Sequence, residues 1–111
     1  MPIESRQIPK GPAVVAISGR LVLGRDVEKL ETVTTELISK GARQFIFDMS
    51  AMDYADSSGI GTLVACLTEI RKAGGELRVA GANARIQRLF SLTGINSMMT
   101  MYASVAEATT A

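Results

Sequence analysis

Apolar positions near the start of the chain follow a strand-like pattern. Residues 5–8 and 13–18 form two short runs, and the proline and glycine residues at 9–12 between them favour a turn. The second run is apolar at consecutive positions instead of alternating, which is typical of a strand covered on both faces. The pattern therefore predicts a β-hairpin whose second strand lies inside a sheet.

The next segment changes to a helical spacing. Within residues 26–40, apolar side chains recur at three- and four-residue intervals, which predicts an amphipathic helix. Asp26 is expected to cap its start, and Gly41 is expected to end it in a left-handed conformation. Residues 45–49 follow as a second buried strand. Because a helix lies between them, the two buried strands are predicted to be parallel.

The second half of the chain repeats this order of strand and helix. Asn83 is a helix cap by residue type, and Ser104 with Glu107 has the spacing of a capping box. The expected elements are a helix at 60–71, a strand at 76–80, a helix at 84–92, an edge strand at 98–102 and a short terminal helix. The sequence therefore predicts one α/β domain spanning residues 1–111, a mixed β-sheet opened by a hairpin and continued by β-α-β units, with helices covering the sheet.

Charge and composition narrow the function. Twelve basic and eleven acidic residues give a net charge of +1 without a basic cluster, so we expect no nucleic-acid partner. No apolar run approaches the roughly 20 residues of a membrane span, and the N-terminal residues lack the apolar core of a signal peptide. We therefore expect a cytoplasmic protein without membrane insertion.

The chain has no histidine, and this excludes several kinds of catalysis. Ser-His-Asp and Cys-His systems are impossible, and zinc would lack its usual ligands. Cys66 lies inside a predicted helix without a basic neighbour, so we expect it to pack as an inert side chain. The sequence predicts a protein that is not an enzyme and that holds no metal or cofactor.

The stretch from 49 to 61, between the second buried strand and the next helix, is the candidate site. It contains acids, serines and glycines at a helix start, where free N–H groups and the positive dipole end favour anions. A structural interpretation makes Ser57 the cap, with Gly59 and Gly61 allowing close packing on the sheet. A functional interpretation adds that Ser58 then occupies the first helical position, with its hydroxyl pointing outward.

Other kinds of site fit this stretch less well. The two glycines begin a dinucleotide fingerprint, but Val64 stands where the third glycine is needed. A magnesium cluster or a receiver-type aspartyl-phosphate pocket would have to be built from Asp48, Asp53 and Asp56. A receiver would also need a further acid pair and a lysine, and both are absent. Asp48 is expected instead to accept hydrogen bonds that fix the loop.

Two further expectations concern the surface. Met49 is predicted to fill the core, whereas Met52 and at least one of the methionines at 98, 99 and 101 are predicted to be exposed. The segment at 24–26 lies at a helix start, where one interpretation is cap chemistry alone, but loops at one end of such a sheet commonly share a surface. We therefore expect this loop to lie near the candidate site.

The order of these segments resembles the STAS family, and within it the bacterial anti-sigma factor antagonists. The similarity lies in the strand at 45–50, the Asp-Ser-Ser-Gly motif at 56–59 opening a helix, and the segments at 75–80 and 92–95. The resemblance implies that Ser58 is phosphorylated by an anti-sigma factor that is also an ATP-dependent serine kinase. It implies that Asp56, with Ser57, Gly59 and Gly61, supports this phosphorylation site, and that the loop at 23–26 lies near it.

The resemblance also implies partner switching. The unmodified protein would bind the anti-sigma factor and so release a sigma factor, phosphorylation would break that complex, and a serine phosphatase would restore it. The implied partner-binding residues are Leu23, Gly24, Arg25, Asp26, Met52, Asp53, Tyr54, Asp56, Ser57, Ser58 and Ile60. The alternative is a non-catalytic STAS subunit of a lipid-transport ATPase complex or a signalling scaffold.

Overall fold

The computed structural model describes residues 3–8 and 11–111. Its strands are β1 (Ile3–Gln7), β2 (Ala13–Leu21), β3 (Gln44–Ala55), β4 (Glu76–Ala80) and β5 (Thr100–Tyr102). Its helices are α1 (Arg25–Ser39), α2 (Ser57–Lys72), α3 (Ala84–Thr93) and α4 (Val105–Thr110), with a 3-10 turn, η1 (Ile95–Ser97), after α3. Half of the predicted turn at 9–12 lies outside the described residues.

The described strands form one sheet in the order β1-β2-β3-β4-β5. β1 pairs with β2 antiparallel, and the β2-β3, β3-β4 and β4-β5 pairs are parallel. This arrangement confirms the mixed α/β sheet, its opening hairpin and its β-α-β continuation.

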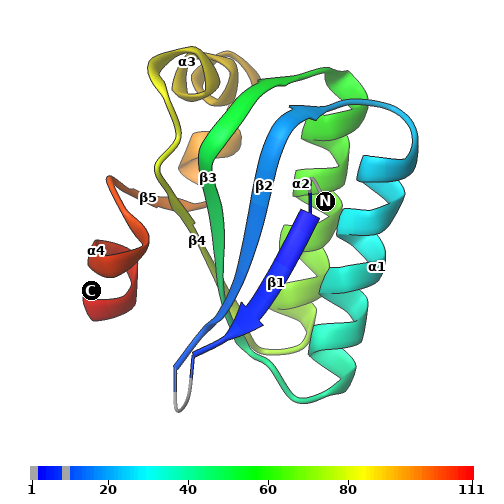
Figure 1. Cartoon of the computed structure of the whole chain (residues 1–111), viewed down its shortest axis with the longest axis vertical. Coiled ribbons are helices and arrows are strands. Elements are labelled where there is room, and N and C mark those ends of the chain that lie inside the picture. The colour runs from blue at the N-terminus through cyan, green and yellow to red at the C-terminus, as the bar shows by residue number, and fades with distance from the viewer. Residues whose placement is uncertain (1–2, 9–10) are drawn as a thin grey trace.

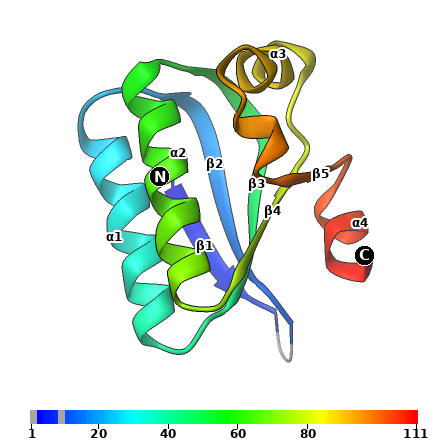
Figure 2. The ribbon, with the colours of Figure 1, turned by 180° about the vertical axis from the view of Figure 1, so that it is seen from behind.

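Helices cover both faces of the sheet. Figures 1 and 2 show α1 and α2 side by side on one face, while the short α4 packs against the other. On β3, Phe45 and Phe47 belong to the core beneath α1 and α2, whereas Ile46 joins a smaller cluster with Ala108 of α4. Burial on both faces explains why the central strands read as continuous apolar runs.

β3 is longer than predicted, because it continues to Ala55 instead of ending at Met49. Its pairing with β2 shifts register beyond Asp48, whose Oδ1 accepts bonds from Ser50 N (3.1 Å) and Ser50 Oγ (2.7 Å). Asp48 is thus the predicted acceptor, but it stabilises an irregularity within a strand and not a loop. The extra residues turn Met52 inward to 1% exposure, so its predicted exposure is wrong.

The helix caps are partly as predicted. Asn83 accepts a bond from Ile86 N (2.9 Å), and Ser104 accepts one from Glu107 N (3.2 Å), which confirms both caps. The prediction for Asp26 is wrong, because α1 is preceded by Gly24 at φ 135°, without a side-chain cap. This φ is accessible to glycine and strained for other residues, so the glycine itself permits the turn into α1.

Candidate functional site at the start of α2

Loops that follow three strands meet at the end of the sheet where α2 begins (Figure 1). The carboxyl ends of β2, β3 and β4 lie at one edge because these strands are parallel. Leu23, after β2, donates its backbone N–H to Asp56 Oδ2 (3.1 Å). Asn83, after β4, donates through Nδ2 to the carbonyl of Met52 (3.1 Å). The predicted proximity of the loop at 23–26 to the motif is therefore confirmed.

Asp56 is the residue that caps α2. Its Oδ1 accepts a bond from Gly59 N (2.8 Å), its Oδ2 holds Leu23, and its own N–H donates to Leu21 O (3.2 Å). The prediction that Ser57 is the cap is wrong, because a carboxylate has two acceptor oxygens and satisfies two backbone donors at once. Ser57 is instead the first helical residue and Ser58 the second.

The two serines stand where α2 exposes free backbone N–H groups. Ser57 is exposed and Ser58 is half-buried. Hydroxyls in the first turn of a helix lie in the positive field of its dipole, so an anionic group added there is partly stabilised. The carboxylate of Asp56 next to them opposes a second negative charge. The arrangement can accept a phosphate, at the cost of local repulsion.

The hydrogen bonds from Gly59 and Leu23 lower the pKa of the Asp56 carboxyl. A carboxyl whose pKa is lower in the folded state stabilises the fold above its ordinary pKa of about 4, and this contribution disappears as pH falls through the lowered value. We expect Asp56→Asn to make the free energy of unfolding depend less on pH in the acidic range. Urea midpoints measured between about pH 3 and pH 6 should fall less in the variant than in the wild type. Parallel pH profiles would contradict this prediction.

Gly59 lies against the end of β2. A Cβ built on Gly59 would overlap the carbonyl oxygen of Leu21, whereas one built on Gly61 meets nothing within 4 Å. Of the two glycines predicted to allow close packing, only Gly59 does so. Its missing side chain brings the first turn of α2 close enough for Asp56 N to reach the same carbonyl of Leu21.

The predicted partner-binding residues differ in their exposure. Leu23 is 76% exposed and Tyr54 is 37% exposed, which leaves two large apolar side chains on the surface beside the serines. Gly24, Arg25 and Asp53 are also exposed, whereas Asp26 and Ile60 are half-buried. Met52 has almost no accessible surface, because the extension of β3 points it into the core. The surface of the site is therefore formed mainly by the loop before α1, the end of β3 and the first turn of α2.

Arg20 is a residue of this surface that the sequence did not indicate. Its guanidinium lies 5.1 Å from the centre of the Tyr54 ring, a cation-π contact. Arg20 and Tyr54 are register partners of β2 and β3. The sequence could not reveal this pair, because Tyr54 pairs with β2 only if β3 extends to Ala55. The apolar run that predicted the strand ends six residues earlier.

Three further findings concern metal binding, the cysteine and the length of the helices. No three histidine, cysteine, aspartate or glutamate side chains within it converge as a metal ion would require. Burial raises the pKa of the Cys66 thiol to about 11, which confirms that this cysteine packs in the core as an unreactive group. None of the described helices combines the length and the apolar character that crossing a bilayer requires.

The comparisons with known proteins agree with this fold. The family model of the STAS domain matches residues 5–108. The chain belongs to the STAS domain family. A curated STAS relative, the anti-sigma-B factor antagonist of Staphylococcus aureus (strain NCTC 8325 / PS 47), is 34% identical over 73 residues, which are 66% of this chain and 68% of the relative.

Solved structures share the STAS fold. The phosphorylated form of SpoIIAA, a Bacillus cell fate determinant, has a TM-score of 0.76 at 21% identity, covering 96% of this chain and 95% of that one. The unphosphorylated form of the anti-sigma factor antagonist SpoIIAA has a TM-score of 0.74 at 16% identity, with coverages of 96% and 92%. A sulfate transporter family protein from Wolinella succinogenes has a TM-score of 0.82 at 20% identity, with coverages of 95% and 87%. At these identities the likeness concerns the fold alone.

Proposed function

We propose that this chain is an anti-sigma factor antagonist that works by partner switching. In its unmodified form it binds an anti-sigma factor through the surface at the start of α2, and the sigma factor is released. The anti-sigma factor is also a serine kinase, and it phosphorylates Ser58 with ATP. A serine phosphatase returns the chain to its binding form.

One observation carries this proposal: two serines stand in the first turn of α2, at an end of the molecule that also presents the exposed side chains of Leu23 and Tyr54. Apolar and aromatic side chains beside a polar rim are typical of protein-binding surfaces. The curated relative named an anti-sigma-B factor antagonist supports the class of partner. The existence of SpoIIAA in phosphorylated and unphosphorylated forms supports a switch by phosphorylation in this family.

The charge of a phosphate accounts for the switch without a change of fold. A phosphoserine carries about −1.5 to −2 charges at neutral pH. At Ser58 this charge would stand in the same helical turn as the carboxylate of Asp56 and near the exposed Asp53. A partner docked over the first turn would have to desolvate all three groups, and repulsion adds to that cost. Binding would therefore weaken while the helix dipole keeps α2 in place.

The direct test is phosphorylation by the cognate kinase. We expect ATP and the purified anti-sigma factor kinase to add one phosphate to the wild type, seen as a mass increase of one phosphate group. Ser58→Ala should abolish the increase, while the matched control Ser57→Ala, one position earlier in the same turn, should keep it. A phosphorylated Ser58→Ala variant, or an unmodified Ser57→Ala variant, would contradict the assignment of Ser58.

The alternative function, a non-catalytic subunit of a transport complex, is compatible with the fold, which a sulfate transporter family protein shares. In that case the same surface would dock permanently on a transport complex, and Ser58 would be a contact residue and not a substrate. The two functions differ in the phosphorylation experiment, because a permanent subunit binds its complex with or without ATP and gains no mass.

A further inference from the structure

The orientation of α3 is determined by contacts at its start. Asn83 caps the helix through Oδ1 and binds the Met52 carbonyl through Nδ2, so α3 begins directly beside the end of β3. Ile86 and Phe90 are fully buried and belong to the main core. Since these two residues are one helical turn apart, the opposite side of α3 faces outward.

The outward side of α3 carries Arg85, Arg88 and Leu92, spaced three and four residues apart, and we call it the α3 face. Both arginines are exposed, and Leu92 is 77% exposed, the largest value among the exposed large apolar side chains. The α3 sequence contains no acidic residue. Neither Arg85 nor Arg88 takes part in the ion pairs seen among the described residues. Those pairs join Lys72 to Glu69 and Arg78 to Glu76.

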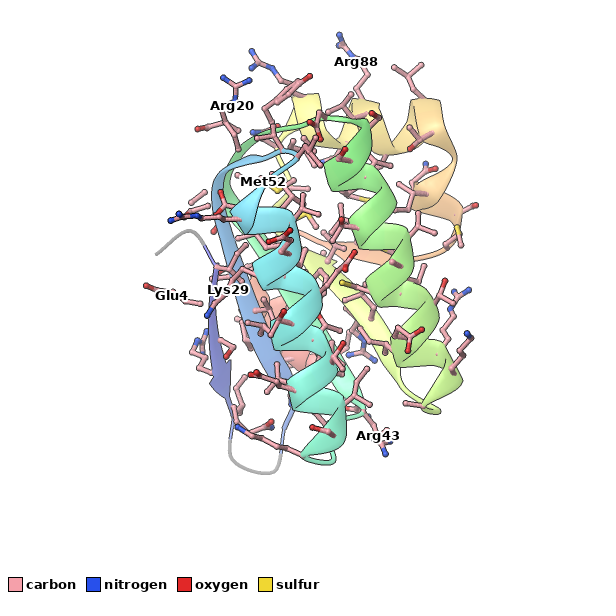
Figure 3. All side chains as sticks on the ribbon, turned by 90° about the vertical axis from the view of Figure 1, so that its right-hand side faces the viewer. Glu4, Arg20, Lys29, Arg43, Met52 and Arg88 are labelled. Carbon is pink, nitrogen blue, oxygen red and sulfur yellow. The ribbon has the colours of Figure 1, made fainter. Side chains whose placement is uncertain are left out.

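The α3 face lies at the same end of the molecule as the serines. Figure 3 shows Arg20 and Arg88 reaching outward from the end where α2 begins, with Met52 below them. Arg20 is held by the Tyr54 ring at 5.1 Å, so a third arginine and an exposed aromatic side chain stand at this end. Arginine and tyrosine are enriched among the residues that dominate the binding energy of protein complexes.

We propose that the α3 face is a second docking surface for the anti-sigma factor and that it binds an acidic patch of that partner. This inference rests on the proposed function and adds the chemistry of the partner's surface. Two arginines without acidic neighbours on their helix are complementary to carboxylates, which guanidinium groups bind through two parallel hydrogen bonds. A nucleic acid is a poorer occupant, because the chain carries a net charge of only +1 and Asp53 is exposed at the same end.

Charge reversal on α3 tests the proposal. The probe is the purified anti-sigma factor kinase that phosphorylates the wild type. Its binding is measured by titration at about 50 mM and about 500 mM salt. The Debye lengths at these two concentrations differ by about threefold. The variant Arg85→Glu with Arg88→Glu should bind at least about tenfold more weakly at low salt, and the deficit should shrink at high salt. The neutral variant Arg85→Gln with Arg88→Gln, which keeps good helix formers, should lose less affinity.

The matched control changes net charge equally at the other end of the molecule. Arg6 and Lys40 are both exposed, and Lys40 lines a surface depression with Gln7 and Gly11, next to the β1-β2 hairpin. Arg6→Glu with Lys40→Glu should bind within about twofold of the wild type, because beyond a Debye length the charges are screened. Melting temperatures of all variants confirm that they are folded.

The outcomes separate the two proposals. Equal binding of the wild type and both α3 variants, with normal Ser58 phosphorylation, would overturn the proposal that the α3 face binds the anti-sigma factor. It would leave the proposed partner switching unaffected. Equal losses in the α3 variant and in the control would also overturn the proposal for the α3 face, because net charge alone would explain them. Binding of duplex DNA that is lost in the α3 variant would reassign the face. If no kinase phosphorylates the wild type at Ser58, both proposals fail.

Discussion

Gly59→Ala is expected to destabilise the protein by about 2 to 3 kcal/mol, the upper part of the range for overpacking a tight contact. The added methyl group would overlap the carbonyl oxygen of Leu21. The methyl carbon and the carbonyl oxygen are both attached directly to the backbone, so neither can rotate away and α2 must move away from β2. The hydrogen bond from Asp56 N to that carbonyl then lengthens or breaks. The melting temperature should fall by about 10 °C for a domain of this size.

Gly61→Ala is the matched control, because it makes the same chemical change two residues later in α2. Gly61 is exposed and a Cβ there meets nothing within 4 Å. Alanine in a helix interior is more favourable than glycine by about 0.5 to 1 kcal/mol, so this variant should be slightly more stable than the wild type. Urea unfolding of the two variants measures the contrast. Equal stabilities would show that α2 and β2 are not in tight contact at Gly59.

Ser58→Asp is expected to weaken binding of the anti-sigma factor by about 10- to 100-fold, which corresponds to about 1.4 to 2.8 kcal/mol. The carboxylate mimics part of the charge of a phosphate and stands in one helical turn with Asp56. The fold should be affected much less, since an acidic residue in the first turn interacts favourably with the helix dipole. Titration of the kinase and thermal unfolding of the same samples separate the two effects.

Ser58→Asn distinguishes charge from size in this experiment. Asparagine has nearly the shape of aspartate but no charge, so the charge mechanism predicts binding within a few-fold of the wild type. A loss as large as that of Ser58→Asp would mean that steric contact at Ser58, and not repulsion, controls the complex. Equal affinities of the wild type and the aspartate variant would remove Ser58 from the switch.

The two caps that were predicted correctly show what local sequence determines. Asn83 and Ser104 each satisfy a backbone N–H three residues later, at Ile86 and Glu107. Such a bond depends only on residue type and helical geometry, so its signal lies within four consecutive residues. The strand at 76–80 was found with its observed bounds for a similar reason, because Gly74 and Gly75 separate it sharply from the preceding helix pattern.

The errors lie where residues distant in sequence decide the structure. Ser57 and Asp56 are both good caps by type, and Asp56 takes the role because its second oxygen also binds Leu23, 33 residues away. β3 continues to Ala55 because the end of β2 supplies hydrogen-bond partners beyond the apolar run that indicated the strand. The inward position of Met52 follows from that continuation and from no local pattern.

By itself the sequence determined the order of strands and helices, the hairpin, the parallel core of the sheet and the motif with its two serines, because periodicity and residue type act over a few positions. Tertiary structure alone decided how that motif is held: Asp56 joins the start of α2 to the loop after β2, Gly59 touches Leu21, and Arg20 rests on Tyr54. These contacts depend on parallel strands ending at one edge of the sheet. Their energies come from groups that only folding brings within hydrogen-bond or van der Waals distance.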